Sequence, residues 1–225
     1  MNLLTRSAAL LLAGACATML VSPLAEADNT PIVSSPSDRL SEVQAEWARI
    51  NYQLPAAERA QAFEALARDT RRWVEGEPQR AEPLIWHGIV LSSQAGAQGG
   101  LGALSIAKEA RETLEKSLKI DKSALQGSAH TSLATLYSKV PGFPIGFGSD
   151  KKAKDHFKQA LAMNPTGIDA NFFYAEYLAD EGDRLQAIQH LKRALAAKDR
   201  PGRELADAGR RKEIQSLLTT IQSKK

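Results

Sequence analysis

The sequence predicts an all-α protein, a helix-turn-helix solenoid with capping helices at its ends. The main support is a helical motif that returns, KAKDHFKQAL at residues 152–161 and QAIQHLKRAL at residues 186–195. A related segment, EARETLEKSL, occupies residues 109–118. A spacing of about 34 residues between equivalent helices is typical of repeat proteins, in which each helix pair stacks on its neighbours to bury its apolar face. This architecture favours surface recognition over chemistry as the function.

The first 27 residues have the pattern of a secretory signal peptide. Arg6 gives the start a positive charge, residues 8–21 are apolar, and an A-x-A cleavage pattern ends at Ala27. We expect cleavage after Ala27, export to a bacterial periplasm, and no stable membrane span in the mature chain, because the apolar run is short for one. An uncleaved membrane anchor and lipidation at Cys16, which would make the protein a lipoprotein, are the alternatives.

Cysteine content and charge exclude several kinds of site. Cys16 is the only cysteine, so the mature chain can form no disulfide and no thiolate metal site. The formal net charge is +3, and the excess of Lys and Arg is concentrated after Arg184. A basic segment can attract nucleic acid or anionic lipid. Export argues against nucleic acid, and a solvated helix face explains the charges more simply, so we expect no nucleic-acid partner.

Ahead of the repeats, the chain predicts a leader and two helices. Residues 28–37 are polar, contain prolines and have no periodicity, as expected of a flexible tether. From Leu40 to Leu54, apolar residues recur at steps of three and four, which predicts an amphipathic helix. A second helix follows Pro55, which suits a first helical turn. Residues 38–80 are therefore expected to form a degenerate repeat or a cap.

Three helical hairpins are expected over residues 81–200. The first begins at Pro83, the second at Ser128 and the third at Ile168. After them, residues 201–225 predict a C-terminal capping helix, because an apolar stripe lies opposite Arg and Lys side chains.

These hairpins resemble the tetratricopeptide repeat family over residues 81–200. The matching positions are apolar or small residues at fixed places in each first helix, followed in the third hairpin by the turn. They are Leu84, Gly88, Leu91, Leu133, Ala134, Tyr137, Tyr174, Ala175, Leu178, Gly182 and Asp183. The small residues let paired helices approach closely. An ordinary helical bundle with chance similarity is the alternative.

The chain departs from the spacing of that family at two places. Residues 92–108 and 140–148 enlarge the connection between the two helices of the first and of the second hairpin. We expect both to be loops that emerge on the same edge of the solenoid. The second loop carries three large apolar side chains, Phe143, Ile145 and Phe147. These side chains either pack onto the solenoid or form a surface that binds a partner. The two alternatives are compatible if the loop folds back over a pocket.

No set of residues supports catalysis, a metal site or a cofactor. The glycines between Gly96 and Gly102 precede a helix, but the spacing of a phosphate-binding loop is absent, so a flexible hinge or a tight turn between helices is the better interpretation. The four histidines form no metal-binding pair, and we expect them to be exposed or at a rim. They are His87, His130, His156 and His190.

In the tetratricopeptide family, the first helices of successive repeats line a concave groove. The resemblance places a mixture of apolar and polar residues there, as a peptide or small-ligand groove requires. They are Ile85, Ile89, Ser128, Thr131, Thr135, Asp169, Phe172 and Glu176. Phe172 can instead belong to the core between repeats. A second hypothesis is a recognition edge formed by the two insertions, because buried aromatic residues are frequent anchors of partners. Its residues would be Trp86, Tyr137, Phe143, Ile145 and Phe147.

The function that these patterns favour is protein binding. The export signal, the small number of repeats, the enlarged connections and YAEYLADEGD at residues 174–183 resemble the periplasmic tetratricopeptide components of tripartite ATP-independent periplasmic (TRAP) transporters. That resemblance implies a protein partner, a periplasmic solute-binding protein, and a small apolar ligand. The alternatives are a scaffold or assembly factor for cell-envelope complexes, a small-ligand-binding protein and an enzyme.

Overall fold

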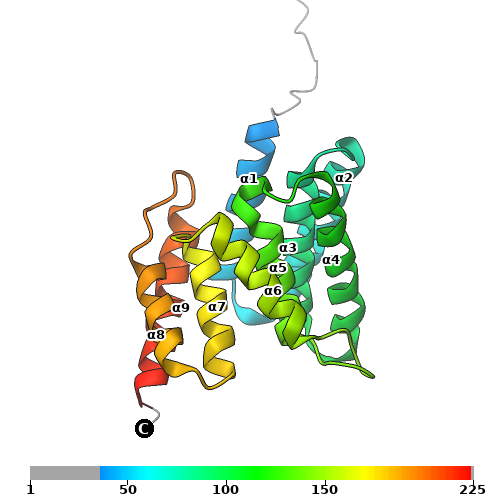
Figure 1. The fold of residues 1–225 in the computed structure, drawn as a ribbon. Helices are drawn as coiled ribbons and strands as arrows, with labels where there is room; N and C mark the ends of the chain where they lie inside the picture. The colour runs from blue at the N-terminus through cyan, green and yellow to red at the C-terminus, as the bar shows by residue number, and fades with distance from the viewer. Residues whose placement is uncertain (1–35, 224–225) are drawn as a thin grey trace, which may run out of the picture. The chain divides into compact units, whose positions relative to one another are not determined.

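A computed structural model describes residues 36–223, and the regular structure of this part is entirely helical (Figure 1). The helices are α1 (Pro36–Gln53), α2 (Ala56–Gly76), α3 (Ala81–Gln98), α4 (Gly100–Ile120), α5 (Ala124–Lys139), α6 (Asp150–Met163), α7 (Ile168–Asp180), α8 (Arg184–Leu195) and α9 (Glu204–Ser223). None of these helices is long and apolar enough to cross a membrane. The expected signal peptide, Cys16 and nearly all of the expected leader lie outside the described residues.

The helices form two layers. Each odd-numbered helix contacts the next odd-numbered one, so α1, α3, α5, α7 and α9 make a continuous inner layer. The even-numbered helices pack outside it, each against the odd-numbered helices before and after it in the chain (Figure 1). This arrangement confirms the predicted fold class, an all-α helix-turn-helix solenoid with capping helices.

The first and the last helix of the inner layer also meet. Tyr52, near the end of α1, packs so closely on α9 that a Cβ at Gly209 would lie 2.4 Å from its ring. Its hydroxyl donates a hydrogen bond to the Glu213 carboxylate at 3.3 Å. The inner layer therefore closes on itself, and we call this contact the α1–α9 closure.

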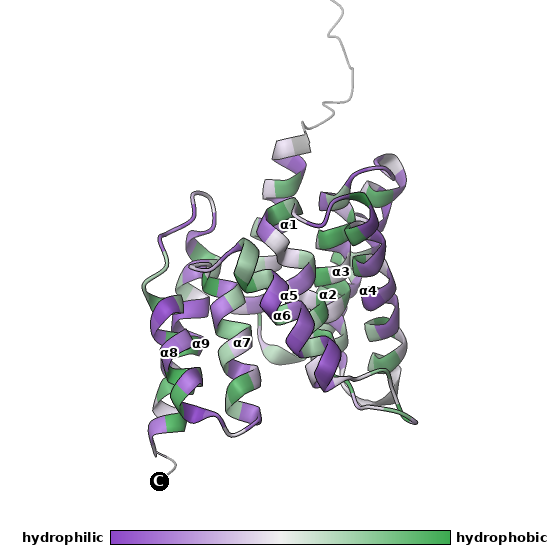
Figure 2. Cartoon of the chain, in the orientation of Figure 1, coloured by the Kyte–Doolittle hydropathy of each residue, from purple (hydrophilic) through white to green (hydrophobic). Residues whose placement is uncertain are grey.

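The recurring motif marks the buried stripe of the outer helices. Its equivalent positions in α4, α6 and α8 are all completely buried. They are Ala110, Leu114 and Ser117, then Ala153, Phe157 and Ala160, then Ala187, Leu191 and Ala194. Figure 2 shows hydrophilic residues on the outward side of α4 and α6. The 3.6-residue periodicity thus separates the core from the solvent face in each outer helix.

The stretch expected as an enlarged loop at residues 92–108 is helical instead. Only Gly99 separates α3 from α4, and Gly99 and Gly100 make the turn with φ angles of 62° and 66°. Ala, Gln and Ser on both sides are compatible with helix, and Ala95 and Ala107 are buried. The extra residues therefore lengthen both helices of the hairpin, and the expectation of a loop was wrong.

The second insertion is a loop and lies between α5 and α6. Its ends are held together because the Gly148 amide donates to the Pro141 carbonyl and the Ser149 amide to the Tyr137 carbonyl, each at 2.9 Å. A side chain at position 148 is impossible without a backbone shift, since a Cβ there would lie 1.9 Å from the Val140 carbonyl oxygen. The loop is thus a fixed part of the fold.

The start of α5 contains a left-handed turn. Leu125, Gln126 and Gly127 have φ angles of 48°, 55° and 76°. The positive φ at position 127 favours glycine, and a Cβ there would lie 2.8 Å from the Met163 sulfur, so this side chain would have to move. The regular part of α5 consequently begins at Ser128, and the turn projects toward the concave side.

Candidate functional site

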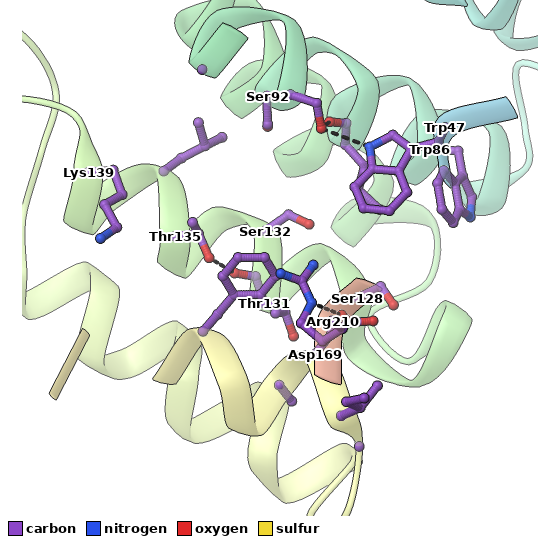
Figure 3. A pocket seen from close by; sticks show the side chains of 18 of the residues that line it. Trp47, Trp86, Ser92, Ser128, Thr131, Ser132, Thr135, Lys139, Asp169 and Arg210 are labelled. Carbon is purple, nitrogen blue, oxygen red and sulfur yellow. Dashed lines mark hydrogen bonds and ion pairs between the residues drawn. The ribbon is translucent and has the colours of Figure 1, made fainter. Parts of the chain in front are cut away.

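A large cavity occupies the concave side of the inner layer. Its volume is about 1080 Å³, and residues of α1, α3, α5, α7 and α9 line it, together with the start of α4 and the loop after α5. Figure 3 shows part of this lining from close by. The α1–α9 closure brings the first and the last helix of the inner layer to the same cavity.

One wall of the cavity is apolar and is built on two tryptophans. Trp47 of α1 and Trp86 of α3 meet edge to face with ring centroids 6.3 Å apart. The Trp47 indole N–H donates to the Ser93 hydroxyl at 2.8 Å, which fixes the orientation of the ring. Ile89 and Leu104 continue this wall toward the start of α4.

A second wall carries hydroxyl groups from α5. Ser128, Thr131, Ser132 and Thr135 follow one side of the helix at steps of three and four, and Figure 3 labels all four. The Ser128 and Thr135 hydroxyls donate to the carbonyls of Leu125 and Thr131. Their oxygens can still accept hydrogen bonds from a bound molecule.

One end of the cavity carries a network of charges. Asp169 at the start of α7 pairs with Arg200 at 2.8 Å and with Arg210 at 2.9 Å. Burial alone would raise the pKa of Asp169, but the two guanidinium groups outweigh it and hold the pKa at about 2. The Arg210 guanidinium also lies 4.6 Å from the ring centroid of Phe172 and 4.5 Å from that of Phe173. Asp169 is therefore ionised and firmly held at neutral pH.

The lining is more basic than acidic. Asp169 is its carboxylate, whereas its cationic side chains come from α5, α9 and the connection before α9. They are Lys139, Lys198, Arg200, Arg203 and Arg210. The C-terminal basic segment was expected to be a solvated face, but Arg210 is only 6% exposed. Part of that charge thus belongs to the interior of the site.

The structure brings most of the expected groove residues together. The cavity lining includes Ile89, Ser128, Thr131, Thr135 and Asp169. Two expected members lie in the core instead, Ile85, which is completely buried, and Phe172, which is covered by Arg210. Glu176 does not line the cavity but pairs with the lining residue Lys139 at 3.5 Å. The neighbouring Phe173 takes the place that Phe172 was expected to have.

The expected recognition edge is divided among different environments. Trp86 is buried and lines the cavity, whereas Tyr137 is buried on another side of α5, and its hydroxyl donates to the Glu115 carboxylate at 2.8 Å. Phe147 packs edge-on against Tyr137 at 5.8 Å and lies 4.6 Å from the Arg111 guanidinium. These three aromatic rings therefore do not form one surface.

Two other side chains of the same loop are exposed. Phe143 is 93% exposed and Ile145 is 66% exposed. Ile145 also lines the cavity, so the loop forms part of its rim. A Cβ at Gly146 would lie 3.3 Å from a Leu104 methyl group, which places the loop against the start of α4. The two insertions therefore lie side by side, although the first one is helical.

Three of the four histidines are buried, whereas all were expected to be exposed or at a rim, and His156 is half-buried. His87, His130 and His190 are buried, and each makes a hydrogen bond through Nδ1. Their partners are Thr70 at 2.8 Å, His156 Nδ1 at 2.8 Å and Asn171 at 2.9 Å. Burial lowers the pKa of both His87 and His130 to about 4, so both are neutral at pH 7. In the described part of the chain, no three side chains are arranged to hold a metal ion.

Sequence reasoning missed the residues that come from the two ends of the chain. Trp47 lies in the segment that was expected to form a degenerate repeat or a cap, and Arg203 and Arg210 lie in the segment whose charges were expected on a solvated face. The periodicity does place Trp47 on the apolar stripe of its helix. It contains no signal that α1 would reach the cavity, because this depends on the α1–α9 closure.

No protein-family profile and no curated protein matches this chain. The tetratricopeptide resemblance accordingly rests on the repeat positions in α3 to α8 and on the two-layer arrangement. Membership of the tetratricopeptide family stays a prediction, whereas the all-α solenoid is observed.

Proposed function

We propose that this protein is an exported binding adaptor of the tetratricopeptide type, which holds a ligand in its concave cavity and a protein partner on the adjoining loop. The observation that carries the proposal is the open cavity of about 1080 Å³ to which all five helices of the inner layer contribute. Small-molecule sites typically measure about 300–1,000 Å³ and combine apolar walls with a few polar groups. The tryptophan wall and the hydroxyl wall meet this description.

Binding accounts for the charged groups of the cavity better than catalysis does. Asp169 stays ionised far below neutral pH because two arginines hold it. A general acid or base works best with a pKa near the operating pH, which this carboxylate does not have. The arginines themselves do not exchange protons under such conditions. The charges can position a ligand but are poorly suited to transfer a proton.

The exposed part of the loop after α5 supports a partner at the rim. Phe143 and Ile145 present two large apolar side chains to solvent on a segment whose backbone is fixed. Such exposed apolar groups mark interaction sites when they adjoin a functional cavity. The resemblance to the periplasmic components of TRAP transporters suggests a solute-binding protein as this partner, and an envelope scaffold is the alternative.

A variant that fills the cavity with a large side chain tests whether a ligand binds there. Ser132 is half-buried and faces the cavity from α5, so a Ser132→Trp variant should occupy its centre. We expect the wild-type protein to enhance the fluorescence of the neutral apolar probe N-phenyl-1-naphthylamine, and Ser132→Trp to weaken probe binding at least about tenfold. Ser216→Trp, on an exposed position of α9, is the matched control and should bind like the wild type. Equal binding by both variants would place the ligand elsewhere.

A further inference from the structure

A guanidinium group without a carboxylate partner lies at the charged end of the cavity. Arg203 sits just before α9 and lines the cavity, with its guanidinium carbon 5.2 Å from the centroid of the Trp86 ring. Its Nε is buried and makes no hydrogen bond within the described residues. No carboxylate of this part of the chain lies within ion-pair distance of it, unlike Arg200 and Arg210 beside it. A partly buried cation in this situation calls for an anion.

The carboxylates near Arg203 are all engaged by other arginines. Arg200 is already shared between Asp169 and Asp207, and Arg210 between Asp169 and Glu213. Burial and then the neighbouring Arg200 lower the pKa of Arg203, although Asp169 and Asp207 act in the opposite direction. The neighbouring Asp169 and Asp207 repel a dianion such as phosphate more strongly than a singly charged group. A carboxylate therefore fits this position better than phosphate does.

The rest of the cavity is elongated and leads away from this end. Trp86 touches Arg203 and belongs to the tryptophan wall, which continues along α3 to Gly96. At 1.5 Å per residue, this stretch of helix is about 15 Å long. Arg203 precedes the start of α9, and the loop with Ile145 follows the end of α5 at the opposite end of the helices (Figure 1). A ligand along this wall would have one end at Arg203 and the other near the loop.

We propose that Arg203 and Trp86 form an anion subsite that binds the carboxylate of an amphipathic organic acid, with its apolar part along Trp86, Ile89 and Leu104. The inference rests on the proposed function, since it names the chemical class of the ligand. The planar guanidinium can bind both carboxylate oxygens, and the ring of Trp86 holds it in place. Charge at one end and apolar surface along the remainder then select acids over neutral molecules of the same shape.

The test compares two probes that differ in the charge of one end and by a single methyl group. The fluorescent acid 11-(dansylamino)undecanoic acid and its methyl ester have the same apolar chain. We expect the wild-type protein to bind the acid roughly tenfold to a hundredfold more tightly than the ester, as hydrogen bonds to a charged group imply. Arg203→Gln should reduce this preference to about twofold or less, while its affinity for the ester stays that of the wild type.

Two further variants separate a specific subsite from general attraction. Lys212→Gln removes an exposed cation of α9 that does not line the cavity, and it should leave the preference for the acid within about twofold of the wild-type value. Arg203→Lys keeps the charge but not the planar fork, and it should retain part of the preference. If Arg203→Gln does not fold, the wild-type ratio of acid to ester and the Arg203→Lys variant decide the question.

The possible failures can be told apart. If the wild type binds neither probe, the ligand cavity of the proposed function is wrong and the subsite falls with it. If acid and ester bind equally well, the cavity stands and the anion subsite is refuted. Equal losses of acid and ester in Arg203→Gln would show that Arg203 only supports the fold, and this too would overturn the inference.

Discussion

Phe143 and Phe147 lie four residues apart in one loop, yet their side chains have opposite environments. Phe143 is 93% exposed, whereas Phe147 is sandwiched between Tyr137 and Arg111. The loop therefore combines an anchor that holds it to the fold with an apolar side chain free to meet a partner. From the sequence, each of the three large apolar residues of this loop could either pack inward or meet a partner. Glycine and proline determine the turns of the loop but do not determine which side chains face inward.

Replacing each phenylalanine by serine separates the two roles. Phe147→Ser should lower the free energy of unfolding by about 2 kcal/mol, through lost apolar burial and lost ring contacts. Phe143→Ser should change it by less than about 0.5 kcal/mol, as surface substitutions usually do. Urea denaturation followed by circular dichroism measures both. In a pull-down with a co-purified solute-binding protein, only Phe143→Ser should lose the partner while keeping wild-type stability. Equal stability losses in the two variants would contradict the division of roles.

At the scale of the element, the α3–α4 hairpin shows how close packing depends on single glycines. Gly88 faces the middle of α4, where an added Cβ would lie 2.5 Å from Leu114 Cγ. Gly96, two turns later in α3, has no atom within 4 Å of such a Cβ, because it lies on the cavity wall. The first glycine is thus required by packing, and the second is not.

The two glycines should respond to alanine in opposite directions. Gly88→Ala should destabilise the protein by about 1–3 kcal/mol, since α3 and α4 must move apart or Leu114 must leave its rotamer. Gly96→Ala should stabilise it by about 0.5–1 kcal/mol, because alanine is the better helix former and meets no neighbour. Thermal or urea unfolding compares the variants directly. A stable Gly88→Ala variant would show that the hairpin is more loosely packed than its geometry indicates.

The hairpins also show what a sequence can and cannot predict here. Ala153, Phe157 and their counterparts in α4 and α8 repeat with a helical period, so the buried stripe of each outer helix followed from the sequence. A tight turn among the glycines around Gly99 was also expected, but the helical structure on both sides of it was not, because alanine, glutamine and serine suit a loop as well as a helix. Groove residues on α5 were found through the repeat. The cavity residues Trp47 and Arg203 were not found, because the two ends of the chain reach the cavity only through the curvature that all the hairpins produce together.

The nine helices of residues 36–223 are held in a closed arrangement by the contact of α1 with α9. Tyr52 is central to it, since its ring covers Gly209, meets Trp47 edge to face at 5.8 Å and bonds to Glu213. Through Trp47, the closure reaches the cavity wall. The terminal helices consequently depend on each other for their stability, although they lie at opposite ends of the described chain.

Tyr52→Ala should loosen both terminal helices at once. We expect a loss of about 3 kcal/mol in stability, typical of deleting a packed aromatic ring. Hydrogen exchange should accelerate in α1 and α9 and change little in α4 and α6, which do not touch the closure. Tyr52→Phe retains the ring and should cost about 1 kcal/mol or less. Faster exchange confined to α1 would mean that α9 is held by α7 and α8 alone.

The α1–α9 closure also bears on how this protein can evolve. Open repeat arrays lengthen by duplication of a unit, because each repeat needs only its immediate neighbours. In this chain, a duplicated α7–α8 hairpin would carry α9 away from α1, separate Tyr52 from Gly209, and split Arg203 from Trp86. One insertion event would thereby lose the terminal contact and the charged end of the cavity together. The repeat number should accordingly be constant among descendants that keep the cavity, and variation should collect in the loop after α5.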